Sequence, residues 1–494
     1  MVSANPKKAS EKDRADYTRP EYESMREERE VIRQSIEGTM ELRKNKDKFL
    51  PKMPSELDES YEIRTDGATY WNTPRKTVQT MANMVMRNEP VIQGGLSESQ
   101  RGIVDAPGPR ERNLLWVIKS GITTGVNFAS GAFFSDMAPV DPGIKTRAEE
   151  RQRKPFVKVL SPLDIINWSW GEHNGQYQLT RVVLKEVTTE PDGEFGVKDV
   201  ERYRVLTPGE YQLFEKVPNK TELLKVTPQP LPIIANGQVL DHIPVYPFSV
   251  EDDGDPFQAR SPIADLTHLS IEHFQLRTDH KASVRMHSFP VLVLLNVLQR
   301  GKIAWGPSSV LTIRGDEADA KLLECSGSSL GALRELIKDN ERLQARQALS
   351  MLERQEVKRM VTATETLEEK AEDLSQLVGL VHSVEEAINK AVDTALAFYG
   401  EPGEADISLN SDVQDLVLTP QEIDTIIKLY ASDMWTWDTC MLKLQEGGFT
   451  PQDFDLEEEK QRKDEQESVK FERENEQQND EQEAETEETE GQMQ

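Results

Sequence analysis

Histidines and acids that recur at fixed spacing are the first residues that could do chemistry. His273, His280 and His287 lie seven residues apart, beside Glu272 and Asp279. Two helical ligands of one metal ion usually lie three or four residues apart, so this spacing does not indicate a zinc site. Seven-residue spacing instead places side chains on one slowly drifting stripe of a helix. The stripe indicates either a helix packed against copies of itself or a polar face.

The acidic run at residues 251–255 is a second possible ion site. Its sequence, Glu-Asp-Asp-Gly-Asp, resembles the start of a calcium loop, but such a loop ends in an acidic ligand at its twelfth position. No acid falls at that position, and Pro256 interrupts the run. We therefore predict no metal ion and no cofactor.

Sequence motifs of catalysis are absent. Gly94, Gly95 and Gly327 lack the following Lys-Ser/Thr of a phosphate-binding GxxxxGK[ST] loop, and no GxSxG, HExxH or CxxC is found. The chain has 88 acids, so carboxylate pairs are too common to identify a catalytic dyad, and its seven histidines accompany no nucleophile motif. We predict that the protein is not an enzyme and has no catalytic residues.

The composition limits the class of protein. The 494 residues suffice for two or three domains with a substantial core, and 36% hydrophobic with 30% charged residues is polar but not disordered throughout. No apolar run approaches the roughly 18–20 residues that span a bilayer. Residues 1–19 lack the apolar segment of a secretory signal. Cys325 and Cys440 cannot form a disulfide framework or a cysteine-rich zinc site, which indicates a reducing cytosol.

Charge is distributed unevenly along the chain. The net charge of −29 argues against a protein that coats nucleic acid with its whole surface. Residues 455–494 hold 17 acids and 5 bases in a Glu/Gln-rich tract, which indicates disorder or a frayed charged helix, or simply a solubilising tail. Residues 260–360 hold 15 bases and 12 acids, a local basic excess in an acidic protein.

A long amphipathic helix over residues 362–400 is the clearest predicted element. Thr362 and Glu365 have the spacing of a capping box, and Gly400 followed by Pro402 marks the end. Nothing interrupts the pattern over roughly 55–60 Å at 1.5 Å per residue. Apolar side chains recur at steps of three and four at Leu367, Ala371, Leu374, Val378, Val381, Ile388, Val392, Ala395 and Tyr399.

The N-terminal part reads as a flexible arm followed by helices. Residues 1–20 form the arm, and Pro20 stands at the first position of a helix that ends in the basic pair Arg43 and Lys44. A second helix begins with Thr73 as its cap and ends before Pro90. We further predict a loop at 91–110, a helix at 113–134 and a polar connection at 136–154.

Residues 155–250 follow the pattern of an antiparallel, meandering sheet. Turn formers separate short runs rich in β-branched and aromatic residues. The segment 242–248 is expected to close this sheet. The predicted strands are residues 156–160, 177–187, 200–206, 211–217 and 223–227.

Helical patterns return after residue 260. We predict a helix from Ser261 to about His287, a strand or helical continuation at 289–298, a strand at 309–313, and a helix at 329–347. In the last of these, Leu333, Leu336, Ile337 and Leu343 are expected inside, and Arg334, Lys338, Arg342 and Arg346 outside. A basic connection at 351–360 precedes the long helix, and a small helical piece is expected at 419–444.

Several phrases, in this order and spacing, resemble the portal proteins (head-to-tail connectors) of tailed bacteriophages, in a group close to those of long-tailed phages. The likeness covers roughly residues 20–455, and the sequence departs from the family pattern around residues 116–137, where relatives have a more regular passage from helix to strand. The matching phrases are RKPFVKVLSPLDIINW at 153–168, RYRVL at 202–206, HIPVYPF at 242–248, PIADLTHLSIEHF at 262–274 leading to Asp279, and TATETLEEK at 362–370.

The resemblance implies an α+β portal fold with a mixed α/β wing, two stem helices flanking a small clip, one long supporting helix, a helical crown and an acidic tail. The implied parts are an arm at 1–20, the wing at 21–255 with its sheet at 155–250, stem helices at 261–288 and 329–347, the clip at 289–328, a tunnel loop at 348–361, the long helix at 362–400, the crown at 401–455 and a disordered tail at 456–494.

The resemblance also implies a function and partners. The protein would form a ring, typically of twelve subunits, at one capsid vertex of the virion, through which double-stranded DNA is packaged and ejected. Other partners would be the terminase large subunit, the major capsid protein and scaffold, and head-completion or tail adaptor proteins, with no membrane involved and synthesis in the host bacterial cytoplasm. The clip residues Arg300, Lys302 and Trp305 would contact the motor or adaptor.

A channel in which DNA slides cannot bind it tightly, because contacts of Lys and Arg with phosphate dominate affinity. A modest basic excess within an acidic body suits sliding. We hypothesise that the DNA-facing bases include Lys338, Arg342, Arg346, Arg354, Lys358 and Arg359. The equally weighted alternative is that the helical bases pair with Glu335, Asp339 and Glu341 across subunits, or face solvent.

Two other classes of protein are alternatives. A non-portal scaffold or internal head protein would explain the helices and the acidic tail, but not the sheet of about one hundred residues. A packaging ATPase is disfavoured by the missing phosphate loop.

Overall fold

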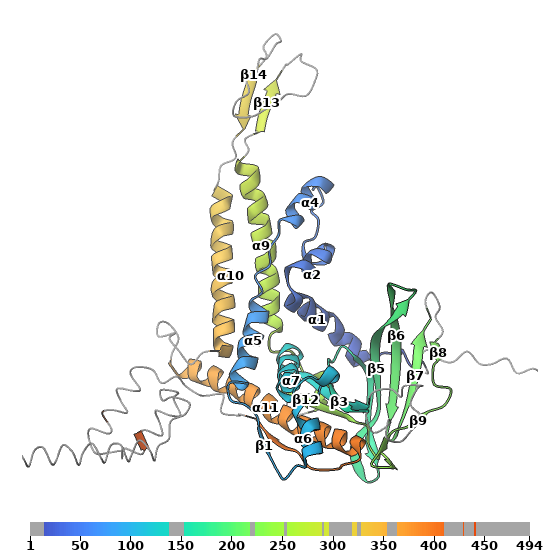
Figure 1. Ribbon diagram of the computed structural model, residues 1–494. Helices are drawn as coiled ribbons and strands as arrows, with labels where there is room; N and C mark the ends of the chain where they lie inside the picture. Colours follow the sequence, from blue (N-terminus) through green and yellow to red (C-terminus); the bar gives the residue numbers. More distant parts are fainter. Residues whose placement is uncertain are drawn as a thin grey trace, which may run out of the picture. The chain divides into compact units, whose positions relative to one another are not determined.

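The computed structural model describes residues 14–137, 153–217, 223–250, 254–288, 291–295, 319–323, 328–352, 363–409, 428 and 439–440. The chain divides into one unit at Met1–Ser411 and another at Asp412–Gln494, and the second holds only the last three of these residues. The first unit combines helices with antiparallel sheets, so the predicted α+β class is confirmed (Figure 1). None of the helices in the described ranges is long and apolar enough to cross a membrane.

The N-terminal helices begin as predicted and end differently. The helix α1 (Pro20–Glu37) has Pro20 in its first turn. Gly38, with φ of 101°, separates it from α2 (Thr39–Lys44), because only glycine adopts this backbone without strain. The short helices α3 (Lys46–Phe49) and α4 (Asp58–Asp66) follow.

The second predicted helix is present as α5 (Thr73–Val85). Its cap is Asn72, whose side chain accepts a hydrogen bond from the Arg75 amide, so the prediction of Thr73 as cap was wrong. Asn72 and Thr73 both have side chains that can cap a helix, so the sequence alone did not decide between them. The Thr73 hydroxyl instead reaches the helix α10, described below.

Residues 91–137 hold more regular structure than predicted. The expected loop at 91–110 contains β1 (Val91–Gln93), α6 (Glu98–Asp105) and the start of the 3-10 turn η2 (Pro109–Glu111). The expected helix at 113–134 ends earlier, as α7 (Leu114–Phe128), and Ala129 with φ of 62° turns the chain into β2 (Ser130–Met137).

Two sheets stand where one was predicted. The strand β2 lies between β3 (Pro155–Leu160) and β12 (Val245–Ser249), antiparallel to both. The segment predicted to close the meander therefore pairs in large part with a strand about 110 residues earlier in the chain. The segment was assigned to the meander because it follows the meander in the sequence. Nothing in its local residue pattern indicates that it pairs with β2.

The meander itself is confirmed. Its strands follow chain order in one antiparallel sheet, β4-β5-β6-β7-β8, and β9 also pairs with β7. The prediction missed β4, although its first four residues belong to a phrase that resembles the portal family. The small hairpin β10–β11 and the 3-10 turn η3 (Pro256–Gln258) complete this part. The strands are β4 (Ile165–His173), β5 (Gln176–Asp192), β6 (Gly196–Thr207), β7 (Glu210–Lys216), β8 (Leu223–Lys225), β9 (Leu231–Pro232), β10 (Ile234–Ala235) and β11 (Gln238–Val239).

The second half holds three long helices. They are α9 (Ala264–Ser288), α10 (Ser328–Leu352) and α11 (Ala363–Tyr399), and between the first two β13 (Val291–Leu295) pairs antiparallel with β14 (Asp319–Leu323). The predicted strand or continuation at 289–298 is thus a strand, and α10 continues past its predicted end at 347. The predicted strand at 309–313 and helix at 419–444 lie outside the described residues, apart from Lys428, Thr439 and Cys440.

The helix α11 is the centre of the core. It contacts α7, β2, β3 and β12, and Gly400 with φ of 85° ends it as predicted. Of the predicted apolar positions whose burial is described, Val381, Ile388, Val392 and Ala395 are buried, and Val378 and Tyr399 are partly buried. The chain then returns through β15 (Asp406–Ser408), which pairs with β1. The side chain of Asn389 in α11 forms hydrogen bonds with the backbone amide and carbonyl of Ile407 in this strand.

Small residues on α7 allow the close packing of this core. A Cβ atom on Gly121 would lie 2.6 Å from Cζ of Phe133, and one on Gly125 would lie 2.4 Å from Cδ1 of Leu380. Both neighbours are buried, so neither side chain can move aside without disturbing others.

We therefore expect Gly121→Ala to destabilise the fold by about 1–2 kcal/mol, because overpacking outweighs the gain in helix propensity. The matched control is Gly331→Ala in α10, where a Cβ would meet open space and the change should stabilise by up to about 1 kcal/mol. Urea unfolding midpoints followed by circular dichroism measure both. A raised midpoint for Gly121→Ala would contradict the packing described.

Candidate functional site

The antiparallel pair α9 and α10 holds the described residues of the predicted DNA-facing set. The two helices run side by side (Figure 1). Each has 25 residues, which at 1.5 Å per residue is about 37 Å. One face of α9 turns toward α1, α4 and α5, and another toward α10.

An apolar cluster fixes α9 to the N-terminal helices. Phe274 is fully buried among residues of α1 to α3 and the segment before α5, and its ring meets Tyr70 edge-on at 5.7 Å. Burial raises the pKa of Tyr70 to about 12. Farther along α9, Asp279 accepts from Arg64 at 3.2 Å, and Lys281 donates to the Gly67 carbonyl at 2.9 Å.

A polar seam, made by Ser270, Asn340 and Gln344, joins α9 to α10. The Gln344 carbonyl oxygen accepts from the hydroxyls of Thr73 at 2.9 Å and Ser270 at 3.0 Å. Its amide donates to Asn340 Oδ1 at 2.6 Å, and the Asn340 amide donates to the Leu269 carbonyl at 3.2 Å and to Glu272 at 3.0 Å. Asn340 and Gln344 are buried, so this network sets the register of the two helices.

The seam corrects the sequence-based assignment of the inner face of α10. Leu336 and Leu343, predicted inside, are 54% and 52% exposed, whereas Asn340 and Gln344 are buried. Hydropathy identifies an inner face only when that face is apolar. The asparagine and glutamine four residues apart were the one available signal, because they share a helical face with the spacing that allows a hydrogen bond.

His273, the first histidine of the stripe, lies within the chain's own interior. It is 1% exposed, its Nε2 lies 3.0 Å from Glu341 Oε1, and its ring packs on Trp71. Burial lowers the pKa of His273, partly offset by Glu341. Its Nδ1 atom has no hydrogen-bond partner among the residues that the structure describes, which fits a neutral ring that donates from Nε2. Among the residues whose positions are described, no group of three His, Cys, Asp or Glu side chains could hold a metal ion.

Basic residues line an exposed stripe of α10. Arg334, Lys338, Arg342 and Arg346 recur every four residues, about 6 Å apart along the axis, and all are exposed as predicted. Lys338 lies 2.8 Å from Glu335, and Arg342 lies 3.0 Å from Asp339. The pKa of Glu335 is lowered by its hydrogen bond from Lys338.

These contacts bear on the two interpretations of the bases. Lys338 and Arg342 have the local partners that the alternative predicted, within the chain. Arg334 and Arg346 form no ion pair with any residue in the described ranges. Exposed pairs on one helix are worth only about 0.3–0.5 kcal/mol, so a passing phosphate could compete for the paired bases as well.

The remaining predicted site residues cannot be placed. Arg354, Lys358 and Arg359 follow the last described residue of α10, and Arg300, Lys302 and Trp305 fall between β13 and β14. All six lie outside the described residues.

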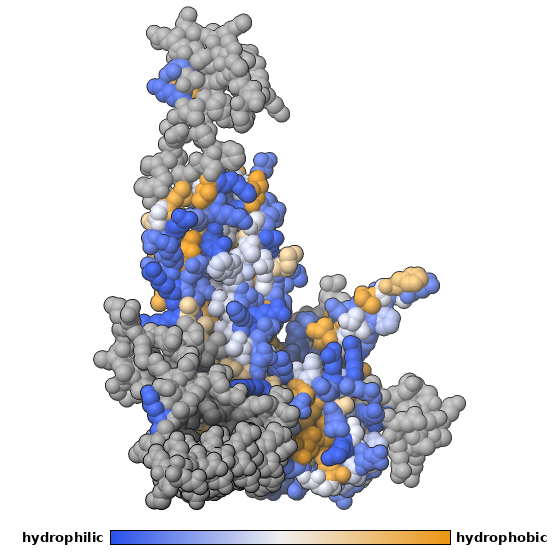
Figure 2. Space-filling view, turned by 60° about the vertical axis from the view of Figure 1, so that its left-hand side comes forward, coloured by the Kyte–Doolittle hydropathy of each residue, from blue (hydrophilic) through white to orange (hydrophobic). Residues whose placement is uncertain are grey.

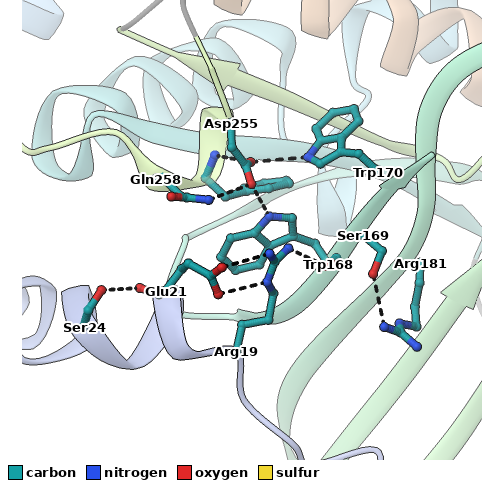
Figure 3. Close-up of polar contacts among 10 residues, drawn as sticks. Arg19, Glu21, Ser24, Trp168, Ser169, Trp170, Arg181, Asp255 and Gln258 are labelled. Atoms are coloured by element: carbon teal, nitrogen blue, oxygen red, sulfur yellow. Dashed lines mark hydrogen bonds and ion pairs between the residues drawn. The ribbon is translucent and has the colours of Figure 1, made fainter.

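A second polar cluster, not predicted, fastens the N-terminal segment to the sheet (Figure 3). Arg19 packs over the Trp168 ring at 4.8 Å, donates to the Trp168 carbonyl at 2.8 Å and pairs with Glu21, whose pKa the Arg19 hydrogen bond lowers. Asp255 accepts from the indole nitrogens of Trp168 at 2.6 Å and Trp170 at 3.3 Å. The acidic run once compared with a calcium loop thus supplies a carboxylate that caps two tryptophans.

The same cluster lines an open cavity of about 920 Å³ between the N-terminal segment and the sheet. Arg181 at its rim donates to Ser169 at 3.1 Å, and Trp170 stacks on Tyr177 with ring centroids 6.2 Å apart. These polar groups satisfy one another, so we assign the cluster a structural role.

Comparison with known proteins gives one family and several remote structures. Residues 262–399 match the family described as "Domain of unknown function (DUF4055)", which spans α9, β13, β14, α10 and α11. No curated protein matches the sequence.

The chain is similar in structure to components of gene transfer agent (GTA) particles. For the neck of the empty particle with C6 symmetry, the identity is 11%, the TM-score 0.35, and 76% of this chain and 89% of that chain are covered. For the native virion, the identity is 10%, the TM-score is 0.35, and 76% of this chain and 89% of that chain are covered. For the neck of the native particle with C12 symmetry, the identity is 10%, the TM-score is 0.36, and 79% of this chain and 93% of that chain are covered.

The polar seam makes a testable prediction. Gln344→Leu removes the partner of Thr73, Ser270 and Asn340 and should cost about 2–4 kcal/mol, because buried polar groups are left unsatisfied. The matched control is Ala345→Leu, the same new side chain at the adjacent exposed position, which should change stability by less than about 0.5 kcal/mol. Urea unfolding measures both, and equal effects would refute the role of the seam.

Proposed function

We propose that this protein is the portal of a phage-like capsid, a ring-shaped channel at one vertex through which double-stranded DNA is packaged and ejected. The observation that carries the proposal is the order of elements from α9 to α11. Two antiparallel 25-residue helices are joined through a segment with a β-strand pair and are followed by a 37-residue helix. The portal resemblance implies this order as stem, clip, stem and supporting helix.

In this assignment α9 and α10 are the stem, the segment between them is the clip, and α11 supports the tunnel loop. The wing comprises residues 21–255, and the crown and the acidic tail follow α11. The ring, proposed to have twelve subunits, would contact the terminase large subunit, the major capsid protein and scaffold, and later head-completion or tail adaptor proteins. Its place is the capsid vertex of the virion, after synthesis in the bacterial cytoplasm, and its role is structural rather than enzymatic.

The electrostatics of α10 support a sliding surface. Four exposed bases alternate with acids that pair with two of them. Such a surface attracts phosphate weakly and repeatedly, whereas uncompensated bases around a ring would hold DNA in place. We propose Lys338, Arg342 and Arg346, with Arg354, Lys358 and Arg359, as the DNA-facing bases, and Arg300, Lys302 and Trp305 as contacts for the motor or adaptor.

Electron microscopy of the purified protein tests the proposal. We expect closed rings, viewed down their axis, with a central channel of about 20 Å or more, which is the width of duplex DNA. The number of subunits follows from the same images. Compact dimers or open filaments would instead favour the alternative of a scaffold or internal head protein.

Charge reversal tests the DNA-facing assignment separately. Arg354→Glu combined with Lys358→Glu should leave ring assembly intact but lower the fraction of DNA-filled heads severalfold, since a like charge in the channel opposes phosphate. The control is Lys390→Glu in α11, an exposed base paired with Glu386, which should fill heads normally. Normal filling by the double variant would remove these residues from the channel lining.

A further inference from the structure

The strands β5 and β6 extend beyond the sheet as a two-stranded ribbon. The strand β4 pairs with β5 only up to Leu184, and β7 pairs with β6 only from Arg202 onward. Within the described residues, the ladder from Glu186 to Asp192 and from Gly196 to Glu201 therefore has no other strand beside it. An isolated two-stranded ribbon is at best marginally stable in water, so we expect this one to be supported in the assembled protein.

One face of the ribbon exposes apolar side chains, among which Asp199 and Glu201 also stand. Val187, Thr189 and Pro191 stand opposite Glu201, Asp199 and Val197 in the register, and directly paired residues of an antiparallel ladder point to the same side. Val187 is 63% exposed and Val197 is 71% exposed, and Phe195 in the connecting turn is 91% exposed. Figure 2 shows hydrophobic surface near the free end of this ribbon. We call Val187, Pro191, Phe195 and Val197 the ribbon face.

Charge determines which partner this face can take. Residues 186–201 contain six acids and one lysine, so pairing of one ribbon with another would bring like charges together. Residues 223–240 contain Lys225 and no acid, although Glu215 and Glu210 of β7 stand opposite Leu224 and Pro232 in the register. This acid-free edge holds β8 and β9, which pair with β7, and the hairpin β10–β11. It exposes the large apolar side chains Leu224, Val226, Leu231, Ile234 and Val239.

We propose that the ribbon face of one subunit docks on the acid-free edge of a second copy of this chain. The two surfaces differ, so the contact is head-to-tail and repeats around a ring or along a filament. The proposal deepens the proposed function, because it rests on the ring for its closed form, and it names the wing surfaces that meet. Phe195, the most exposed aromatic side chain among the described residues, becomes the anchor of the contact.

Photo-crosslinking identifies the partner. We would incorporate benzoylphenylalanine at position 195, mix equal amounts of ¹⁴N- and ¹⁵N-labelled chains, irradiate the assembly and identify linked peptides by mass spectrometry. The expected result is mixed-isotope pairs that join position 195 to residues 223–240. Incorporation at Tyr177, exposed near the other end of β5, is the control and should not yield these pairs.

Each outcome separates the two proposals. Rings whose crosslinks avoid 223–240, or join position 195 to another protein, overturn this contact and leave the portal proposal standing. Crosslinks to 223–240 in open filaments support the contact and contradict the portal. An absence of intermolecular crosslinks in protein that forms no oligomer contradicts both.

A charge variant measures the strength of the contact. Phe195→Asp should raise the concentration for half-maximal assembly at least tenfold, because a central aromatic anchor is lost and a seventh acid is added. Its melting temperature as a monomer should not change, since the side chain is exposed. The control is Thr188→Asp, which adds the same charge on the opposite face of the ribbon and should alter assembly far less. Equal effects of the two variants would overturn the proposal.

Discussion

Burial of the apolar face of α11 is the interaction on which the rest of the first unit depends. Val381, Ile388 and Val392 are fully buried, and each such side chain contributes about 1.5–3 kcal/mol when removed from water. Hydrogen bonds also join the helix to the strands β2, β12 and β15. Ser135 of β2 donates to the Ala391 carbonyl at 2.7 Å, and the Ser249 amide of β12 donates to Ser383 at 3.0 Å. Helix and sheet thus constrain each other in both position and register.

The helices α9 and α10 are held together by a different kind of interaction. On its outer side α9 uses ordinary apolar packing around Phe274, but toward α10 it presents hydrogen-bonding groups that Asn340 and Gln344 satisfy. Buried polar networks contribute little net stability when complete but penalise every alternative register. Because the seam joins the two helices, Leu336 and Leu343 remain exposed on the outside of α10.

Sequence patterns predicted the elements whose burial is apolar and local. The period of α11, the glycine at its end and the alternation in the meander were read correctly because each signal lies within one element. The pairing of β12 with β2 was missed because it joins strands more than a hundred residues apart. The seam was missed because the buried residues of α10 that contact α9 are polar, and hydropathy does not identify a polar inner face. The exposure of Lys338, Arg342 and Arg346 was predicted correctly. The roles proposed for Arg354, Lys358 and Arg359, and for Arg300, Lys302 and Trp305, remain predictions because these residues lie outside the described ones.

The net negative charge of the chain is distributed unevenly over the structure. The ribbon is acidic at its exposed end, residues 223–240 contain no acid, and α10 alternates bases with acids on its outer stripe. The ribbon and residues 223–240 therefore differ in charge, which would favour the proposed head-to-tail contact over the pairing of two ribbons. A surface that must let a polyanion pass needs its bases balanced nearby, as Glu335 and Asp339 balance theirs. In the proposed portal, subunit association would depend on the ribbon and residues 223–240, and DNA passage on α10, so the two demands on charge would fall on separate elements.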